Sequence, residues 1–376
     1  MYERIKHMLM KEFIQIFRDP KMKGIIFLTP IIQVLIFGYA VTTDVKHVAT
    51  AVYDLDNSVA SRELVSRFVK SGYFDVVEYI NNEGRDRDLI DHGKVRVVFR
   101  MNKGFEDDLR AGRTAQLQVI VDGTDSNTAG VVLDYSAKIV GQFSQKIFIT
   151  RYTQIKGPAE RTARIEMQTR AWFNENLESR NFYVPGVIAI IVMLITLMLT
   201  SMAIVREKEV GTMEQILVTP ITQTEFILGK TVPFAIIGIA DAIMITLIGV
   251  FWFEVPIRGN LFILFIATAL YLMTTLGIGL LISTVSKTQQ EAMMSAFLFY
   301  FPAVLLSGFM FPIANMPVIV RWLTYLNPLR YFLVIVRGIF LKGVGPIILW
   351  PHMIALAIMG IVILWIASKR FRKTIA

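Results

Sequence analysis

The chain has 376 residues, of which 54% are apolar, and it carries a formal net charge of +9 at pH 7. This apolar share exceeds that of an average soluble domain, and it is unevenly distributed. One apolar stretch stands alone near the N-terminus, about 139 residues of globular composition follow, and the remainder is dense in apolar stretches. The pattern excludes an ordinary soluble enzyme and predicts a membrane anchor, a soluble domain and a membrane bundle.

Six segments are long and apolar enough to cross a bilayer, which takes roughly 20 residues. They are residues 24–43, 183–205, 231–252, 262–284, 292–311 and 347–367. A single segment of this kind could be a buried core helix, but six in one chain, nearly free of charge, argue against that alternative. The sequence therefore predicts a polytopic α-helical membrane protein with six transmembrane helices.

The basic surplus indicates the topology. Residues 44–182 contain 20 basic and 20 acidic side chains, whereas six Lys or Arg precede the first span and four follow the last. Positive residues that flank spans stay on the cytoplasmic side. We therefore expect both termini in the cytoplasm and residues 44–182 outside. A neutral outer domain offers no surface for nucleic acid, so the surplus is expected to contact anionic membrane lipid.

Residues 1–23 have the pattern of an amphipathic helix. Ile5, Leu9, Phe13 and Ile16 recur at helical spacing, and the charged residues lie elsewhere. A basic amphipathic helix beside a span is expected in the inner membrane interface, although a solvated tail is the alternative. Asp19-Pro20 should end it, because the residue before a proline disfavours the helical conformation.

The outer domain, residues 44–182, alternates strand and helix patterns, which predicts an α/β fold between the first and second spans. The expected strands are Val48–Tyr53, Val76–Ile80, Val95–Met101 and Gln116–Val121. The expected helices are Ser61–Ser71, one near Glu83–Gly93, Phe105–Ala111, one over about 128–153, and Thr162–Glu178.

Residues 183–376 form the predicted five-helix membrane domain. After the second span comes a short charged segment, about residues 207–220, which parity places in the cytoplasm and which proline ends at Pro220. Between the fifth and sixth spans, the amphipathic stretches Val318–Tyr325 and Leu329–Leu341 predict re-entrant or interfacial helices over residues 312–341. Irregular backbone survives at membrane depth only where protein covers it or water reaches it.

No catalytic, nucleotide or metal constellation emerges. Leu228-Gly229-Lys230-Thr231 resembles the end of a phosphate-binding loop, but the glycine that the full motif requires is replaced by Thr224. The four histidines are scattered, and the acidic pairs Asp54/Asp56 and Asp122/Asp125 are explained by turn formation. We therefore expect no enzyme activity and no cofactor on this chain.

Asp241 is the one acidic residue well inside a predicted span. An intramembrane carboxylate is energetically unfavourable and is a functional hypothesis by default. It could line a polar cavity on the substrate path, bind a cationic substrate, or bond to Ser or Thr of a neighbouring helix.

Three motifs resemble those of one family. Glu209-x-Gly211-Thr212-x-Glu214-Gln215-x-Leu217-x-Thr219-Pro220 follows the second span, Arg180-x-Phe182-x-Val184-Pro185-Gly186 precedes it, and Asn327-Pro328-Leu329-x-Tyr331 with Arg337 lies in the re-entrant region. Together with the layout of nearly the whole chain, they are similar to the permease subunit of a type-2 ATP-binding-cassette exporter. The large outer domain resembles the drug-efflux-like branch.

The resemblance implies a division of labour. Such permeases work as dimers, with a second copy or a paralogue, and contact separate cytosolic ATPases that bind ATP and Mg. A coupling helix would seat in the ATPase, with the N-terminal helix supporting it. In this chain the residues of the coupling helix would be Glu207, Glu209, Gly211, Thr212, Glu214, Leu217, Thr219 and Pro220. The complex would export a hydrophobic or amphiphilic substrate across the cytoplasmic membrane of a bacterium, and a periplasmic adaptor would dock outside if the cell has two membranes.

Two other hypotheses stay open. A membrane-anchored receptor would bind its ligand with the outer domain, but it would normally carry a cytoplasmic output domain. An ion-driven secondary transporter would need paired half-helices and more intramembrane polar groups than Asp241.

Overall fold

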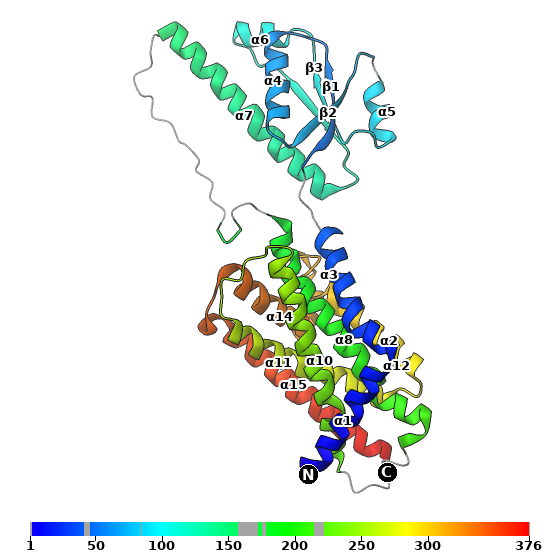
Figure 1. Ribbon diagram of the computed structural model, residues 1–376. Helices are drawn as coiled ribbons and strands as arrows, with labels where there is room; N and C mark the ends of the chain where they lie inside the picture. Colours follow the sequence, from blue (N-terminus) through cyan, green and yellow to red (C-terminus); the bar gives the residue numbers. More distant parts are fainter. Residues whose placement is uncertain are drawn as a thin grey trace. The chain divides into compact units, whose positions relative to one another are not determined.

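The computed structural model describes residues 2–40, 46–82, 84–156, 172–174, 178–213 and 222–375. The chain forms two compact units, one made of Met1–Thr42 with Arg170–Ala376 and the other of Thr43–Thr169 (Figure 1). We call them the membrane unit and the α/β unit. The predicted helix Thr162–Glu178 falls largely outside the described residues, whereas residue 182, the predicted end of the outer domain, is described and lies in the helix Ser179–Val210.

The membrane unit begins with the helix α1 (Tyr2–Arg18) and the short helix α2 (Pro20–Lys23). α1 stops immediately before Asp19-Pro20, and Pro20 then opens the next helix, where its missing N–H is tolerated. A π-helical turn, η1 (Gly24–Leu28), leads into α3 (Thr29–Ala40). The buried face of α1 carries Met8, Glu12 and Ile16, so Glu12, which was expected on the polar side of the helix, lies on the buried side.

Four long apolar helices make up much of this unit. They are α8 (Ser179–Val210), α10 (Gln223–Phe251), α11 (Leu261–Val285) and α15 (Pro346–Ile375). Within the described residues, these four are long and apolar enough to cross a membrane. The other two predicted spans correspond to shorter helices, over Gly24–Tyr39 and at α12 (Gln289–Leu305). The structure thus agrees with a membrane protein of several spanning helices.

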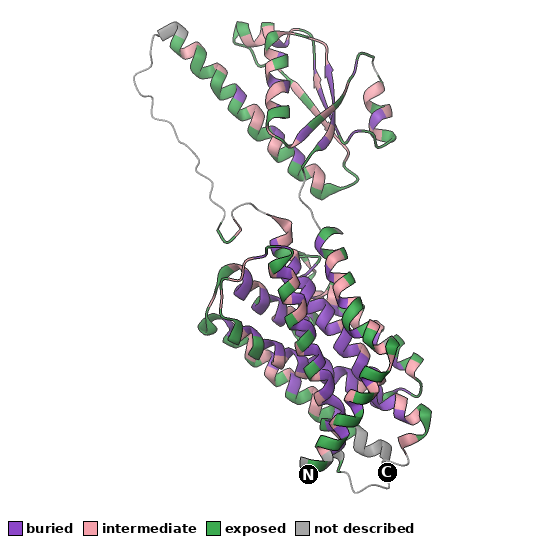
Figure 2. Cartoon of the chain, viewed as in Figure 1, coloured by how far each residue is buried: buried purple, intermediate pink, exposed green. Residues whose placement is uncertain are grey.

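α8 lies at the core of the membrane unit, because most of its apolar stretch is buried against neighbouring helices (Figure 2). Small residues let α11 approach it closely. A Cβ at Gly279 of α11 would lie 2.0 Å from the Thr200 hydroxyl oxygen and 3.0 Å from the Leu197 carbonyl oxygen of α8. Thr196 of α8 also donates a hydrogen bond to Thr275 of α11 at 3.0 Å. Interhelical contacts of this kind hold helices together where the surroundings are apolar.

Short helices connect α12 to α15. They are η2 (Ile313–Asn315), α13 (Val318–Leu323), η3 (Thr324–Leu326), α14 (Pro328–Arg337) and η4 (Gly338–Lys342). Their positions match the two amphipathic stretches predicted from the sequence. α14 begins at Pro328, with Asn327 as its N-cap.

The α/β unit contains a four-stranded sheet in the order β2-β1-β3-β4. Its strands are β1 (Val48–Asp54), β2 (Phe74–Tyr79), β3 (Val97–Met101) and β4 (Leu117–Val121). β1 is parallel to β2 and β3, whereas β4 is an antiparallel edge strand. The helices are α4 (Val59–Lys70), α5 (Arg85–Asp91), α6 (Phe105–Ala111) and α7 (Ser126–Lys156).

Alternating side chains of the central strands feed two cores. On one face Phe68 of α4 packs against Phe74 and Phe99, with ring centroids 5.3 Å and 4.0 Å away. On the other face Leu89 of α5 belongs to the cluster that contains Val98. This alternation follows from the period of two along a strand, and it is why the predicted strands lie close to their observed positions.

Asp56 organises the start of α6. Its carboxylate accepts hydrogen bonds from the N–H groups of Gly104, Phe105 and Glu106 at 2.7 Å, 3.1 Å and 3.1 Å. Partial burial raises the pKa of Asp56, but hydrogen bonds from Ser58 and from these N–H groups outweigh it and hold the pKa below its ordinary value of 3.8. The sequence interpretation of this residue as structural fits that geometry.

Candidate functional site: a buried charge cluster

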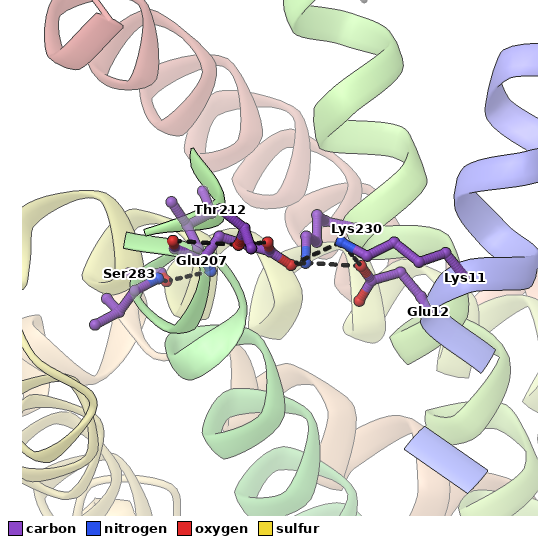
Figure 3. Close-up of polar contacts among 8 residues, drawn as sticks. Lys11, Glu12, Glu207, Thr212, Lys230 and Ser283 are labelled. Atoms are coloured by element: carbon purple, nitrogen blue, oxygen red, sulfur yellow. Dashed lines mark hydrogen bonds and ion pairs between the residues drawn. The ribbon is translucent and has the colours of Figure 1, made fainter. Parts of the chain in front are cut away.

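Four charged side chains from three helices meet beside the predicted coupling segment (Figure 3). Lys11 and Glu12 come from α1, Glu207 from the end of α8, and Lys230 from the first turns of α10. Lys230 Nζ lies 2.7 Å from Glu12 Oε1 and 2.7 Å from Glu207 Oε1. Lys11 Nζ lies 3.1 Å from the same Glu207 oxygen. We call these four residues the charge cluster.

Three members of the charge cluster are almost inaccessible. Lys230 is 2% exposed, Glu207 3% and Glu12 4%, whereas the side chain of Lys11 is about half exposed. A buried charge is tolerated only when it is paired, and here two cations balance two carboxylates. The Lys230–Glu207 contact has hydrogen-bond geometry, while the Lys230–Glu12 contact is a close ion pair without it.

Further polar contacts fix the end of α8 around Glu207. The Thr212 hydroxyl donates to the other carboxylate oxygen, Glu207 Oε2. Gly211 ends α8 with φ +80°, a left-handed conformation that suits glycine, and its N–H donates to the Lys208 carbonyl oxygen. The segment after α8 therefore folds back so that Thr212 reaches Glu207.

α11 supports the same end of α8 from another side. The Ser283 hydroxyl oxygen accepts hydrogen bonds from the N–H groups of Ile204 and Val205 at 3.0 Å and 3.2 Å. Lys208 donates to the Thr284 carbonyl oxygen at 3.2 Å. The cytoplasmic end predicted for α8 is thus held by α1, α10 and α11 together.

The start of α10 is equally well defined. Thr222 is its N-cap and forms a capping box with Glu225, in which the Thr222 N–H donates to Glu225 Oε2 at 2.7 Å. Reciprocal bonds of this kind satisfy two of the free N–H groups at a helix start. Gly229 then lets Met8 of α1 pack directly on α10, because a Cβ there would lie 2.5 Å from the Met8 sulfur.

The structure describes part of the predicted coupling segment. Glu207 is buried in the charge cluster, and Gly211 and Thr212 lie beside it. Glu209 is exposed and accepts hydrogen bonds from both the backbone N–H (3.0 Å) and the side-chain amide of Gln289, at the start of α12. The remaining predicted residues, Glu214, Leu217, Thr219 and Pro220, lie outside the described residues.

Asp241 lies on α10, away from the charge cluster in sequence. It is 1% exposed, and among the described residues neither carboxylate oxygen has a hydrogen-bond partner. One alternative drawn from the sequence was a hydrogen bond from Asp241 to Ser or Thr of a neighbouring helix. The described residues show no such bond. A buried carboxylate without partners remains the functional hypothesis for this helix.

The residues of the predicted re-entrant motif make contacts that the sequence did not specify. Asn327 accepts from the Leu329 N–H at 3.1 Å and donates to the Ala303 carbonyl oxygen of α12 at 2.6 Å. The Tyr331 hydroxyl donates to the Tyr325 carbonyl oxygen at 2.9 Å. These contacts attach α14 to the preceding turns and to α12, with Pro328 in the first turn.

Arg337, at the end of α14, reaches the start of α8. Its guanidinium lies 3.7 Å from the centroid of the Phe182 ring, and Nη1 donates to the Gly308 carbonyl oxygen at 3.2 Å. A cation over an aromatic face is favourable. The contact links two motifs, Arg180–Gly186 and Asn327–Arg337, that lie far apart in the sequence.

Three members of the charge cluster, Lys11, Glu12 and Lys230, were not predicted as site residues. Lys230 was considered only as part of an incomplete phosphate loop, and Glu12 was assigned to the polar side of the N-terminal helix. The position of each charge was the sequence feature that could have pointed to burial. Glu12 lies four residues from both Met8 and Ile16, on the same helix face, and Lys230 lies at the edge of a predicted span. Pairing them required the structure.

The chain matches the model of a known family and several relatives. The family is described as ABC-2 family transporter protein, and the match covers residues 24–369. The chain is 34% identical over 364 residues to the probable multidrug ABC transporter permease YbhR of Escherichia coli, covering 96% of this chain and 97% of YbhR. It is 35% identical over 377 residues to the probable multidrug ABC transporter permease YbhS of Escherichia coli, and the match covers 98% of this chain and 97% of YbhS.

A third relative is the inner membrane transport permease YhhJ of Escherichia coli, 31% identical over 333 residues, which cover 86% of this chain and 85% of YhhJ. The family match over residues 24–369 includes the whole α/β unit and reaches all four of the long apolar helices described above. The chain therefore belongs to the ABC-2 family of transporter proteins.

Proposed function

We propose that this chain is the membrane-spanning permease subunit of an ATP-driven exporter. It moves a hydrophobic or amphiphilic substrate outward, and a separate cytosolic ABC ATPase binds ATP and Mg and hydrolyses the nucleotide. The family match supports the permease assignment, and the names of YbhR and YbhS as probable multidrug permeases support the substrate class. This chain would supply the substrate path through the membrane and the mechanical link from the ATPase to that path.

The charge cluster is the observation that carries the proposal. It joins α1, the end of α8 and the start of α10 through contacts of 2.7 Å and 3.1 Å. α8 and α10 are the two elements that flank the predicted coupling segment. A segment that is pushed by an ATPase transmits motion only if both of its attachments are stiff. Paired, buried charges with capped helix ends supply that stiffness at this point.

The proposed topology places the charge cluster near the cytoplasmic face of the inner membrane of a bacterium. Both termini would lie inside and the α/β unit outside. α3 with η1 and α12 would complete six spans, and α13 with α14 would form the re-entrant region on the outer side. The assembled exporter would contain two permeases, identical or paralogous, and a periplasmic adaptor where the cell has an outer membrane.

Asp241 is the proposed substrate-path residue. Its carboxylate is buried without a hydrogen-bond partner among the described residues, so it would be available to a cationic group on an otherwise apolar substrate. Asn327, Pro328, Tyr331 and Arg337 would hold the re-entrant helices in place at the outer end of the path. Their contacts to Ala303, Tyr325 and Gly308 support a positioning role.

The test is to purify the tagged chain from its own cells and to assay ATP hydrolysis and export by the complex that comes with it. Glu209→Lys combined with Glu214→Lys should leave the complex folded but uncouple hydrolysis from export. Glu209 is exposed, so the change reverses charge at the predicted ATPase contact without disturbing a core. Asp107→Lys, a charge reversal at an exposed position of the α/β unit, is the control.

Normal export by the double variant would remove the coupling assignment. A chain that purifies without any ATPase activity, and yet binds a ligand, would favour a receptor or an ion-driven carrier. In that case Asp241→Asn separates the two, because it should abolish transport by a carrier that uses this carboxylate and leave a receptor's outer domain unaffected.

A further inference from the structure

One end of the membrane unit carries an excess of positive charge. α8 connects the two ends, since Glu207 of the charge cluster lies in its last turn and Phe182 lies in its first turn. The segments 178–182, 252–261 and 306–346 begin or connect helices at the Phe182 end, which we call the basic end. They contain two acidic and six basic side chains, which are Glu178, Glu254, Arg180, Arg258, Arg321, Arg330, Arg337 and Lys342.

Most of these cations have no carboxylate partner. Arg180 takes both acidic residues, because it pairs with Glu178 at 2.8 Å and lies 4.0 Å from Glu254. Within the described parts of the chain, the other five basic side chains form no ion pair. Residues 292–376 contain no Asp or Glu at all. Lys and Arg are normally sparse in the short outer loops of membrane proteins, so an uncompensated excess at the proposed outer end requires an anion from elsewhere.

Two of the unpaired arginines, Arg321 of α13 and Arg330 of α14, are connected through Thr324. The Thr324 hydroxyl donates to the Arg321 carbonyl oxygen at 2.7 Å and accepts a hydrogen bond from Arg330 Nη1. The Arg330 guanidinium is stacked 3.9 Å from the centroid of the Tyr325 ring, and Arg321 Nη2 donates to the Ala314 carbonyl oxygen at 2.7 Å. Arg330 is thus fixed in orientation, while its Nε and Nη2 bond to none of the described residues and are not enclosed.

Exposed apolar side chains accompany these two arginines. Ile319, Trp322 and Leu326 are each at least 70% exposed. We call residues 318–326 together with Arg330 the arginine surface. Tryptophan is enriched where a membrane meets water, and arginine can lay its stem along apolar surface while its charge reaches the headgroups. A surface that mixes basic and exposed apolar side chains binds anionic lipid through both kinds of contact.

We propose that the arginine surface binds an anionic phospholipid, whose phosphate accepts hydrogen bonds from Arg321 and Arg330 and whose acyl chains contact the exposed apolar side chains. Guanidinium groups match the oxygens of a phosphate well. A second copy of this chain could also cover the surface, but it would bring the same unpaired cations, and like charges in contact repel. The outer leaflet as the source of the lipid rests on the topology proposed above, whereas the binding itself does not.

Bromine atoms on a lipid quench tryptophan fluorescence only at close range, so they report which lipid lies beside Trp322. The full-length chain is reconstituted in phosphatidylcholine bilayers that contain a fixed minor share of phosphatidylglycerol. Trp322 is kept as the sole tryptophan, and phenylalanine replaces Trp172, Trp252, Trp350 and Trp365. One sample contains brominated phosphatidylglycerol, and the other contains an equal share of brominated phosphatidylcholine. We expect phosphatidylglycerol to be preferred at Trp322 by about five-fold or more, the ratio expected for one basic residue at a membrane surface.

Three pairs of substitutions show whether the arginines cause the preference. Arg321→Gln with Arg330→Gln should abolish it, because no charge then attracts the phosphate. Arg321→Lys with Arg330→Lys keeps both charges and should retain a preference, which separates lost charge from a lost fold. Arg87→Gln with Arg113→Gln removes the same net charge from two exposed positions of the α/β unit, where each arginine has an acidic partner. This matched control should leave the preference at Trp322 unchanged.

Trp252 as the sole tryptophan is the control for position. It is exposed at the end of α10, near Glu254, and both brominated lipids should quench it equally. An equally strong preference at Trp252 would show that the net charge of the chain gathers the lipid, and would overturn the site. Equal quenching of Trp322 by the two lipids, or a preference that survives both Gln substitutions, would also overturn it.

Absence of quenching at Trp322 by either lipid would show that protein covers the arginine surface, and the lipid would then be the wrong occupant. Every sample lacks an ATPase and a transport substrate. The lipid site can therefore fail while the export function holds, and export can fail while the lipid site holds.

Discussion

Replacement of Lys230 by methionine is the most direct test of the charge cluster. Lys230 contacts two carboxylates at 2.7 Å and is 2% exposed. Lys230→Met keeps an apolar side chain of similar length but leaves Glu12 and Glu207 buried without their shared cation. Breaking a buried ion pair in this way costs about 3–5 kcal/mol. Lys11 still lies 3.1 Å from Glu207, so we expect the lower end, about 3 kcal/mol.

Two further variants make the prediction specific. Lys11→Met removes the other cation, whose side chain is about half exposed, and should cost less than about 1 kcal/mol. Adding Glu12→Gln and Glu207→Gln to Lys230→Met removes the unpaired negative charges and should restore most of the lost stability. The rescue distinguishes unpaired charge from a simple packing defect, which the extra substitutions would not repair.

Thermal unfolding followed by tryptophan fluorescence measures the loss of stability in the membrane unit. All five tryptophans lie in Arg170–Ala376, so the signal excludes the α/β unit. A loss of about 3 kcal/mol corresponds to a lower Tm by about 6–12 °C for a unit of this size. Equal shifts for Lys230→Met and Lys11→Met, or no rescue by the two Gln substitutions, would refute the description of a buried, charge-balanced cluster.

Four further predictions concern other parts of the fold. Because the pKa of Asp56 is lowered in the folded state, its stabilising contribution should be present above its ordinary pKa of 3.8 and be lost as the pH falls through the lowered, folded-state pKa. Amide hydrogen exchange across α6 measures this, and Asp56→Asn should abolish that pH dependence. Gly279→Ala should lower the Tm of the membrane unit, because its Cβ would overlap Thr200, at a cost of about 1–3 kcal/mol. Gly130→Ala on α7, where nothing lies within 4 Å, should instead stabilise the α/β unit by about 0.5–1 kcal/mol. Asn327→Ala should destabilise the membrane unit by about 1–2 kcal/mol through the lost N-cap of α14, and a Tm shift below the error of the measurement would contradict that role.

Local patterns predicted much of the fold. The helix Phe105–Ala111 was placed at its observed bounds, and the strand predicted at Val48–Tyr53 is observed as Val48–Asp54. Such elements follow from periodicities of two and 3.6 residues, which are visible within a short window. The sheet order β2-β1-β3-β4 and the antiparallel edge strand were not predicted, because pairing depends on contacts between residues far apart in sequence.

The charge cluster shows the same limit in chemical terms. Glu12 and Lys230 are separated by more than 200 residues, and each alone resembles an ordinary charge at a helix surface or span end. Lys230 even lies in a sequence that imitates part of a phosphate loop. Burial is what gives these charges significance, and burial is a property of the packed helices. Glu207 was predicted to belong to the coupling segment, and its position inside the cluster adds a contact that no motif contains.

The use of charge at this position has a physical consequence for the proposed exporter. Apolar side chains of the same volume would often stabilise the contact of α1, α8 and α10 as well as ions do, but they would tolerate sliding of one helix along another. A lysine held between two carboxylates at 2.7 Å permits one register, because a shift of one turn, about 5.4 Å, would leave buried charges unpaired. We therefore expect α1 to move together with the ends of α8 and α10 when the segment between them is displaced.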